Sequence, residues 1–275
     1  MTATVPDRPK VLVPLAVLDG ESLAPALVEA LSTVPVELVG YHALPEQTPP
    51  GQARMQFEER MEGELADLVT VFEDAGGRVE TRMVFTHEPE QTFERVAVEA
   101  SCDAVLLNNP ATEVEDVLVP LRGEVNVERV IALVASVLEA TEADATLYHV
   151  ADSDEEREAG HDLVNRAKAA LVEGGIAADR VREEIVVSET PIKTLVATAS
   201  EYDLVVMGES KPSVRELFFG EVSEQVASQS VTPALVVRRL PALEGENDGE
   251  SERESEGEGG TAGTETETET DSQSE

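Results

Sequence analysis

The sequence alternates short apolar runs with longer amphipathic segments, and this alternation occurs twice. Apolar runs of strand length lie at 11–15, 36–44, 79–85 and 102–109, then at 117–121, 145–151, 182–187 and 202–210. Continuous apolar runs are typical of parallel strands that helices cover on both faces. A further run, 233–237, follows only the second series. The pattern predicts an α/β fold with doubly wound parallel sheets.

The two series share their landmarks in one order, which indicates an internal duplication of about a hundred residues. Each begins with VLVPL and continues through a Tyr-His pair, a glycine pair and a helix opened by proline. We expect two tandem domains, residues 9–109 and 114–240. The first is truncated to four strands and the second has five. The strand at 102–109 would then be an edge, so we expect the second copy or another chain to cover it.

Local signals place the ends of the helices. Residues 154–175 have one apolar face, with Asp152, Ser153 and Asp154 as candidate N-caps and Gly174-Gly175 as a left-handed stop. Residues 241–275 are acidic, almost free of apolar side chains and contain TETETET. Such a composition predicts a disordered tail.

Charge narrows the range of partners. The chain has 57 acidic and 20 basic residues, a formal net charge of −37. Without a cluster of basic residues, nucleic acid is not expected as a partner. An acidic, lysine-poor chain favours a salt-rich cytosol, such as that of a halophilic archaeon, over a merely acidic protein. The single cysteine, Cys102, fits the core of a cytoplasmic protein, and no apolar run is long enough to span a membrane.

Residues 190–238 carry the features that point to a known family. DLVVMG, then FFGEVSEQV, then TPALVVR follow the order of motifs in the universal stress protein family, which this stretch resembles. The resemblance is strong over 114–239 and weaker over 10–107. It implies an adenine-nucleotide alpha-hydrolase-like fold with strand order 3-2-1-4-5, dimers or tandem pseudo-dimers, and cytoplasmic, stress-linked regulation. Some members of the family bind ATP and many do not.

The chain departs from the ATP-binding pattern that the resemblance implies, Gly-x2-Gly-x9-Gly-Ser/Thr with an Asp after the first strand. Gly208 and Gly220 are present, but Lys211 replaces the second glycine, and Glu221 stands where Ser or Thr is expected. Arg122 occupies the Asp position. A DGES segment at 19–22 comes too late after the first strand to match the family's Asp-Gly-Ser.

These departures predict a degenerate nucleotide site formed by Gly208, Ser210, Lys211, Gly220, Glu221 and Arg122. Glu221 would put a carboxylate at the helix N-terminus that receives phosphate, and like charges repel there. Paired with Arg122 or Lys211, it would leave the site self-neutralised. Two alternatives remain open. Glu221 makes no contact with Arg122 or Lys211, or these two basic residues bind an anion themselves. Ser210 is either a ligand contact or an ordinary loop residue.

Other candidate groups do not form a catalytic pattern. His42 and His149 end the second strand of each copy, and no nucleophile recurs beside both, so we expect structural roles. The sequence has no metal-ligand spacing. We therefore expect no enzyme, no metal and no cofactor, with ATP disfavoured. The expected function is regulation through self-association, an intrachain pseudo-dimer or an unknown protein partner. The alternative is a nucleotide- or anion-binding sensor.

Overall fold

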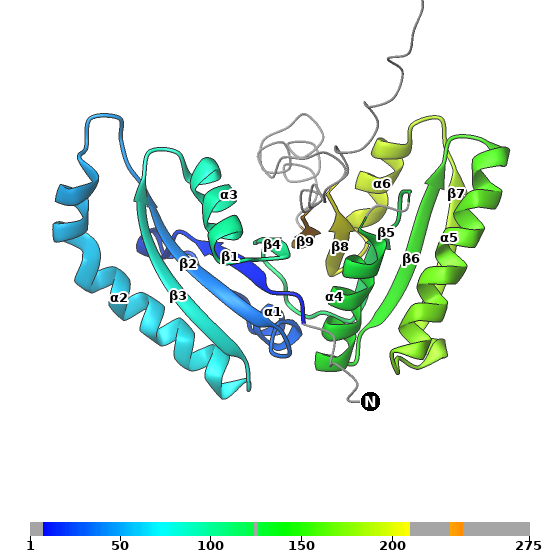
Figure 1. The fold of residues 1–275 in the computed structure, drawn as a ribbon, viewed down its shortest axis with the longest axis horizontal. Coiled ribbons are helices and arrows are strands. Elements are labelled where there is room, and N and C mark those ends of the chain that lie inside the picture. The colour runs from blue at the N-terminus through cyan, green and yellow to red at the C-terminus, as the bar shows by residue number, and fades with distance from the viewer. Residues whose placement is uncertain (1–7, 124–125, 210–231, 239–275) are drawn as a thin grey trace, which may run out of the picture. The chain divides into compact units, whose positions relative to one another are not determined.

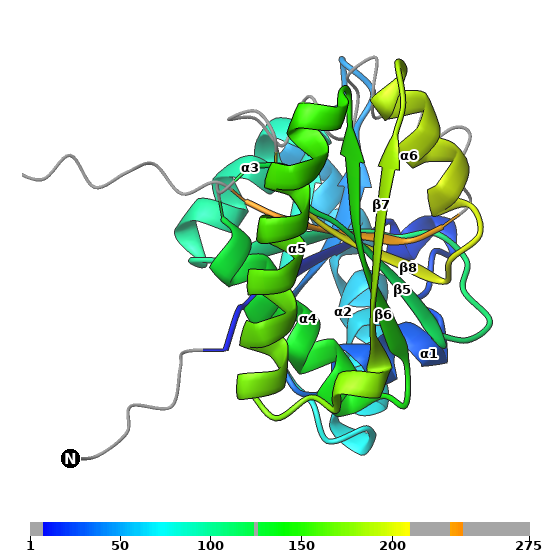
Figure 2. The ribbon, with the colours of Figure 1, turned by 90° about the vertical axis from the view of Figure 1, so that its right-hand side faces the viewer.

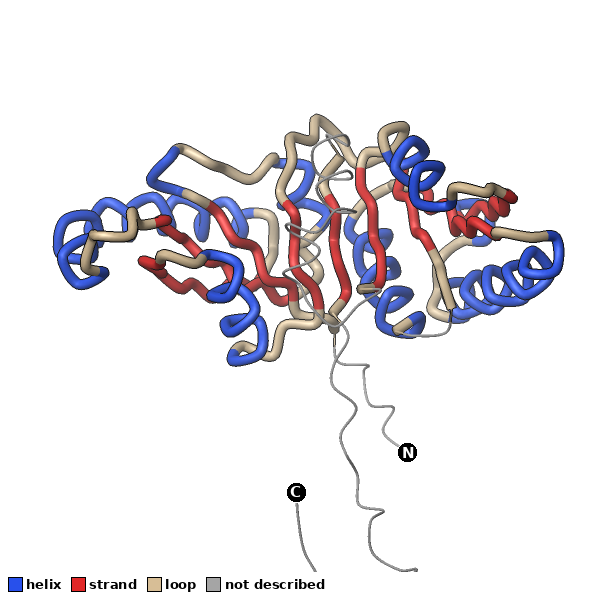
Figure 3. The backbone as a smooth tube through the Cα atoms, turned by 90° about the horizontal axis from the view of Figure 1, so that it is seen from above, coloured by secondary structure: helices blue, strands red, loops and turns tan. Residues whose placement is uncertain are grey.

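The computed structural model describes residues 8–123, 126–209 and 232–238, all within one compact unit, residues 1–240. These residues form a sheet of nine strands in the order β3-β2-β1-β4-β9-β8-β5-β6-β7, which Figure 3 shows as one row. The strands are β1 Val11–Leu15, β2 Pro35–Ala43, β3 Arg78–Thr86, β4 Ala104–Leu107, β5 Asp116–Pro120, β6 Asp144–Ala151, β7 Val181–Val187, β8 Leu204–Gly208 and β9 Ala234–Val237. The predicted α/β fold is confirmed, but in place of two parallel sheets there is one mostly parallel sheet, because β9 pairs with both β4 and β8.

Strand register is the same in the two halves of the sheet. Val11 and Leu12 of β1 pair with Ala104 and Val105 of β4. At the corresponding place, the first two residues of the second VLVPL run, Val117 and Leu118, pair with Leu204 and Val205. β2 and β3 flank β1 in the same way that β6 and β7 flank β5. Both halves therefore have the strand order 3-2-1-4.

β9 joins the two halves. It pairs in parallel with β8 and antiparallel with β4, with Leu107 opposite Ala234 and Ala104 opposite Val237. The expectation that a segment from the second half covers the edge at 102–109 is confirmed. Beyond the ladder, the Arg238 N–H donates to the Asp103 carbonyl at 2.7 Å, and Arg238 Nη1 donates to the Cys102 carbonyl at 3.0 Å. Arg238 is buried, so the junction excludes water.

Helices cover both faces of the sheet (Figure 1). One continuous core on the first face contains apolar side chains of α1, α2, α4 and α5 from both halves. The other face has two separate clusters, one around Phe93 and Val96 of α3 and one around Ala199 of α6. Figure 2 shows α5 and α6 on opposite sides of β6 and β7. The helices are α1 Pro25–Ala30, α2 Pro50–Asp74, α3 Pro89–Glu99, α4 Val127–Ala140, α5 Asp154–Glu173 and α6 Pro191–Ala199.

The predicted helix ends agree with the structure in all but one detail. Ser153 is the N-cap of α5, where its Oγ accepts from the Glu156 N–H, and α3 and α6 open with proline. The stop after α5 uses Gly175, with φ 102°, because Gly174 keeps a right-handed conformation. Only the second glycine needs the conformational freedom that a left-handed residue requires. The predicted tail, residues 241–275, lies outside the described residues.

Candidate functional site

The site to be expected in an open α/β sheet lies outside the carboxyl ends of the strands, where the strand order reverses. In this sheet those points lie between β1 and β4 and between β5 and β8. Parallel pairing brings the loops after both strands of each pair to the same edge. The two crevices contain different side chains, so each is described by itself.

In the first crevice a carboxylate bridges the ends of the two strands. Glu21 Oε2 accepts a hydrogen bond from the N–H of Ala16, the residue after β1, at 2.7 Å. Its Oε1 accepts from Nδ2 of Asn108, the residue after β4, at 2.8 Å. Both donors lie at the ends of β1 and β4, the switch point where ligands bind in open α/β sheets. Glu21 therefore supplies the negative charge from within the chain.

The surroundings of this carboxylate are consistent with an occupied crevice. Burial raises the pKa of Tyr41 on β2, and the negative charges of Glu21 and Asp19 raise it further. A second anion would meet the same repulsion. The role of residues 19–22 was not predicted, because this segment lies too far after the first strand to match the family's Asp-Gly-Ser motif. The available signal was an acid a few residues after the first strand.

The second crevice contains two of the residues predicted to form the nucleotide site. Gly208 is the last residue of β8 and is half-buried, and Arg122 is exposed in the loop after β5. The pairing of β5 with β8 places both at one edge of the sheet. Ser210, Lys211, Gly220 and Glu221 lie outside the described residues, and so does the helix predicted near Gly220. The contact of Glu221 with Arg122 or Lys211 remains a prediction.

The floor of the second crevice is fixed by a buried histidine. His149 on β6 is 4% exposed, and its Nδ1 lies 2.8 Å from the Leu121 carbonyl, to which it donates. Its Nε2 has no partner among the described residues. Glu209, also buried, donates its backbone N–H to the Val237 carbonyl at 2.8 Å, which ties the end of β8 to β9. These contacts hold the strand ends in place.

Within the described ranges, the structure shows no cluster of three or more His, Cys, Asp or Glu residues that could hold a metal ion. In the same ranges, none of the helices has the length and apolar character that crossing a bilayer requires. His42 is packed against the rings of Phe57 and Phe85, at centroid distances of 5.3 and 6.4 Å.

Comparison with known families assigns the second half of the sheet. Residues 113–238 match the model of the Universal stress protein family. This segment is a universal stress protein domain. The match includes β5 to β9, and therefore both strands of the second crevice and the strand that pairs with β4. A search of curated proteins gave no match.

Solved structures extend the similarity to the first half. A universal stress protein from Archaeoglobus fulgidus is similar over 84% of this chain and 96% of its own, at 16% identity and TM-score 0.59. The cytoplasmic domain of a prokaryotic cation chloride cotransporter is similar over 84% and 96%, at 10% identity and TM-score 0.51. An A. fulgidus universal stress protein in complex with dAMP matches 46% of this chain and 98% of its own, at 18% identity and TM-score 0.37. The first two matches establish a shared fold only.

Proposed function

We propose that the protein is a tandem universal-stress-type regulatory protein that acts in the cytoplasm through contacts with partners and binds no ATP. The tandem assignment, residues 9–109 and 114–240, is supported by the common strand order and register of the two halves. The antiparallel β4–β9 ladder then gives the chain an intramolecular dimer interface. A protein built in this way does not need a second chain to complete its sheet.

The observation that carries the absence of ATP binding is the carboxylate of Glu21 in the first crevice. It occupies the Ala16 N–H and the Asn108 amide, which are donors for an anion at the switch point. In the second crevice the sequence supports the same conclusion, because Lys211 and Glu221 replace a glycine and a hydroxyl residue of the binding pattern. Both crevices would be neutralised by residues of the chain itself.

Isothermal titration of the full chain with ATP in high salt tests this proposal. The wild type should show no micromolar binding, and micromolar binding would contradict the closed crevices. The double variant Glu221→Ser with Lys211→Gly restores the family pattern and should gain affinity. Far-UV circular dichroism of the variant serves as the folding control.

The second candidate function is an anion sensor in the second domain. It is favoured by the exposure of Arg122 beside the end of β8. In that case the wild type binds nucleotide or phosphate, and Arg122→Gln weakens binding, whereas the closed-crevice proposal expects no difference between the two proteins. A charge-matched control is Arg182→Gln on β7, away from the crevice.

A further inference from the structure

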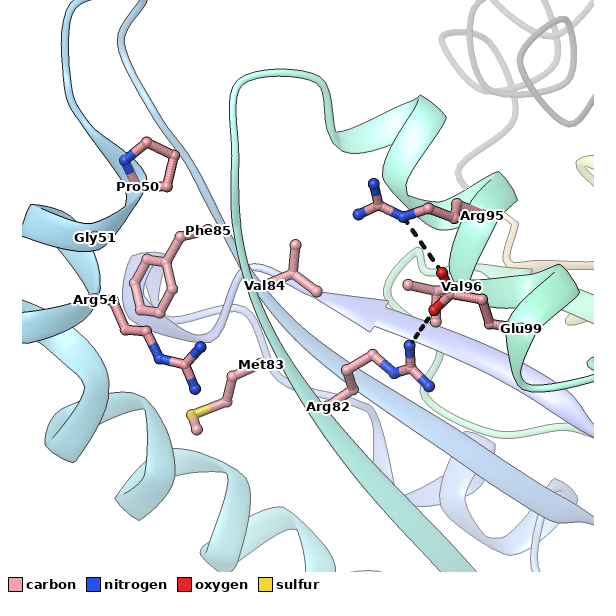
Figure 4. A pocket seen from close by; sticks show the side chains of 10 residues that line it. All are labelled: Pro50, Gly51, Arg54, Arg82, Met83, Val84, Phe85, Arg95, Val96 and Glu99. Atoms are coloured by element: carbon pink, nitrogen blue, oxygen red, sulfur yellow. Dashed lines mark hydrogen bonds and ion pairs between the residues drawn. The ribbon is translucent and has the colours of Figure 1, made fainter.

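The outer edge of β3 is the wall of a cleft that is separate from both crevices. β3 is the last strand of the sheet, and no described strand pairs with its outer side. The cleft has a volume of about 560 Å³ and follows four consecutive residues of β3 (Figure 4). Its remaining walls are the first turns of α2 on one side and the last turns of α3 on the other. The lining residues are Pro50, Gly51, Arg54, Arg82, Met83, Val84, Phe85, Arg95, Val96 and Glu99.

This cleft is basic, although the chain as a whole is strongly acidic. Three arginines line it, together with a single acid. Glu99 lies between two of the arginines, 2.6 Å from Arg82 Nη1 and 3.7 Å from Arg95 Nε. Arg54 uses its Nε to bind Glu58 at 2.8 Å. The ion pairs of Arg54 and Arg95 within the described residues thus involve Nε alone, and their terminal nitrogens are available to a ligand.

The opposite edge of the sheet has the reverse character. β7 contains Glu183 and Glu184, and the ion pairs of its arginine engage both terminal nitrogens, whereas in the cleft, as far as the structure describes it, only Arg82 is paired with two acids, Glu37 and Glu99. Arg182 lies 3.1 Å from an Asp116 oxygen and 2.6 Å from an Asp144 oxygen. Only 20 of the 275 residues are basic, and the cleft places two arginines, Arg54 and Arg95, whose ion pairs among the described residues leave the terminal nitrogens to a ligand, where the β7 edge has Arg182 paired through both. Charge therefore distinguishes the two edges.

The cleft has the shape of a groove along a strand. Met83 and Phe85 pack against the core that includes α2, whereas Val84 packs against the cluster of α3. Figure 4 shows Arg54 on the α2 side, and Arg82 and Arg95 on the α3 side. A second hollow of about 390 Å³ continues along β3, where Thr81 and Met83 face α2; its one charged lining residue is Glu62, so the acidic part of a ligand belongs in the first hollow. An extended ligand would follow both hollows along the strand.

We propose that the β3 edge binds an acidic, extended segment of a partner protein, which adds to the sheet as a tenth strand. An edge strand presents unpaired N–H and C=O groups, which another chain can pair with. Arg54 and Arg95 would bind carboxylates of the segment, one on each side of the sheet. The inference adds a partner surface to the proposed function, and it needs neither the duplication nor the closed nucleotide crevices.

The net charge of the protein does not prevent such binding. At an ionic strength of about 0.15 M the Debye length is about 8 Å, so distant acids are screened while Arg54 and Arg95 act at contact range. Binding should weaken as salt rises, since the exposed guanidinium groups are screened as well. Local charge thus selects an acidic partner even on an acidic protein.

The direct test is fluorescence anisotropy of the full chain with a labelled peptide of about seven residues, a typical strand length, made of glutamates and two valines. The wild type should bind it. The double variant Arg54→Gln and Arg95→Gln should bind about tenfold more weakly, as expected for lost charge-assisted hydrogen bonds. Both side chains are more than half exposed, at 58% and 66%, so the variant should remain folded.

Two controls identify the source of affinity. Arg182→Gln removes one positive charge from the β7 edge, against two in the double variant, and it should leave binding unchanged. A peptide with glutamine in place of every glutamate should bind at least tenfold more weakly, because guanidinium groups prefer charged acceptors. Equal loss in Arg182→Gln, or equal affinity of the glutamine peptide, would contradict the assignment.

Backbone pairing is tested with two N-methylated peptides, one methylated at odd positions and the other at even positions. In a paired strand only one set of N–H groups faces β3, so one peptide should lose binding and the other should retain it. If both bind like the parent peptide, or if inorganic phosphate competes as strongly as the peptide does, the cleft is a small-anion site. Absence of peptide binding by the wild type would equally overturn the proposal.

Discussion

At the scale of single residues, Gly160 of α5 lies close against His149 of β6. A Cβ on Gly160 would lie 2.3 Å from Cδ2 of His149 and 2.8 Å from its Nε2. No side chain tolerates such a contact, so glycine is required here by space rather than by backbone conformation. The histidine ring is buried and held by its hydrogen bond to the Leu121 carbonyl, which a shift away from a new Cβ would strain.

Gly160→Ala should therefore lower the free energy of unfolding by about 1–3 kcal/mol, the usual cost of overpacking a core. The measurement is urea denaturation at equilibrium. Gly63→Ala is the matched control, because Gly63 also lies inside a helix but a Cβ there meets nothing within 4 Å. The control should be neutral or more stable, since alanine is the better helix former. Equal destabilisation in both variants would contradict the steric argument.

Cys102 is a second residue whose chemistry is set by burial. It is 1% exposed, and burial raises the pKa of its thiol to about 11. The prediction that this cysteine belongs to the core is confirmed. At neutral pH the group is protonated, and the thiol rather than the thiolate faces the core around Phe93.

Native protein at pH 8 should consequently react with iodoacetamide far more slowly than protein unfolded in urea, as mass spectrometry can follow. The same shift makes stability depend on pH. The folded state retains the proton from the unfolded pKa of about 8.5 up to about 11, so this contribution to stability is present below pH 8.5 and lost as pH rises. Stoichiometric labelling of native protein at the unfolded rate would show that the thiol is accessible.

At the scale of elements, β9 stabilises both halves at once. It is only four residues long, yet it is paired on both sides, with β4 and with β8. All four of its side chains are buried. An element with these neighbours cannot be lost without exposing two strand edges.

Val236→Pro tests this role. Proline removes an N–H and does not fit a central strand, so we expect a loss of about 3 kcal/mol or more in urea denaturation. Val236→Ala, which keeps the ladder and removes only side-chain volume, should cost less. Analytical ultracentrifugation should show association of the proline variant through the exposed β4 and β8 edges. A variant that stays monomeric and as stable as Val236→Ala would show that the ladder contributes little.

Much of this architecture was predictable from the sequence, because strands that are buried on both faces appear there as continuous apolar runs. The first four strands of each half and β9 were found in this way, and so was the need to cover the edge at 102–109. The antiparallel direction of β9 was not, since an apolar run carries no sign of which way a neighbour runs. β9 is parallel to β8, so its direction against β4 depends on how the two halves of the sheet are oriented to each other.

The candidate sites were less predictable, because they depend on distances between elements. Glu21 acquires its role from Asn108, which lies 87 residues later in the chain. The arginines of the β3 edge come from α2, β3 and α3 and have no common motif. Of the residues that the family resemblance singled out, Gly208 and Arg122 lie at the predicted edge of the sheet, and the others lie outside the described residues.

At the scale of the whole molecule, charge dominates. With 57 acids and 20 bases, ion pairs can neutralise only a minority of the carboxylates. The remaining acids repel one another, and the repulsion is stronger in the compact state than in the unfolded chain. Raising the salt from about 0.1 M to about 1 M shortens the Debye length from about 10 Å to about 3 Å. We therefore expect the thermal midpoint to rise steadily with KCl over this range, as measured by calorimetry.

A variant with fewer surface acids separates the repulsion between carboxylates from the other effects of salt. α2 carries the exposed acids Glu59, Glu62 and Asp67 on its solvent side, and none of them forms an ion pair in the described structure. Glu59→Gln, Glu62→Gln and Asp67→Asn together remove three negative charges from the surface. This variant should be more stable than the wild type in low salt and should gain less from KCl, because there is less repulsion to screen. An identical salt dependence in both proteins would instead point to a general effect of KCl on burial, which does not depend on the number of surface acids.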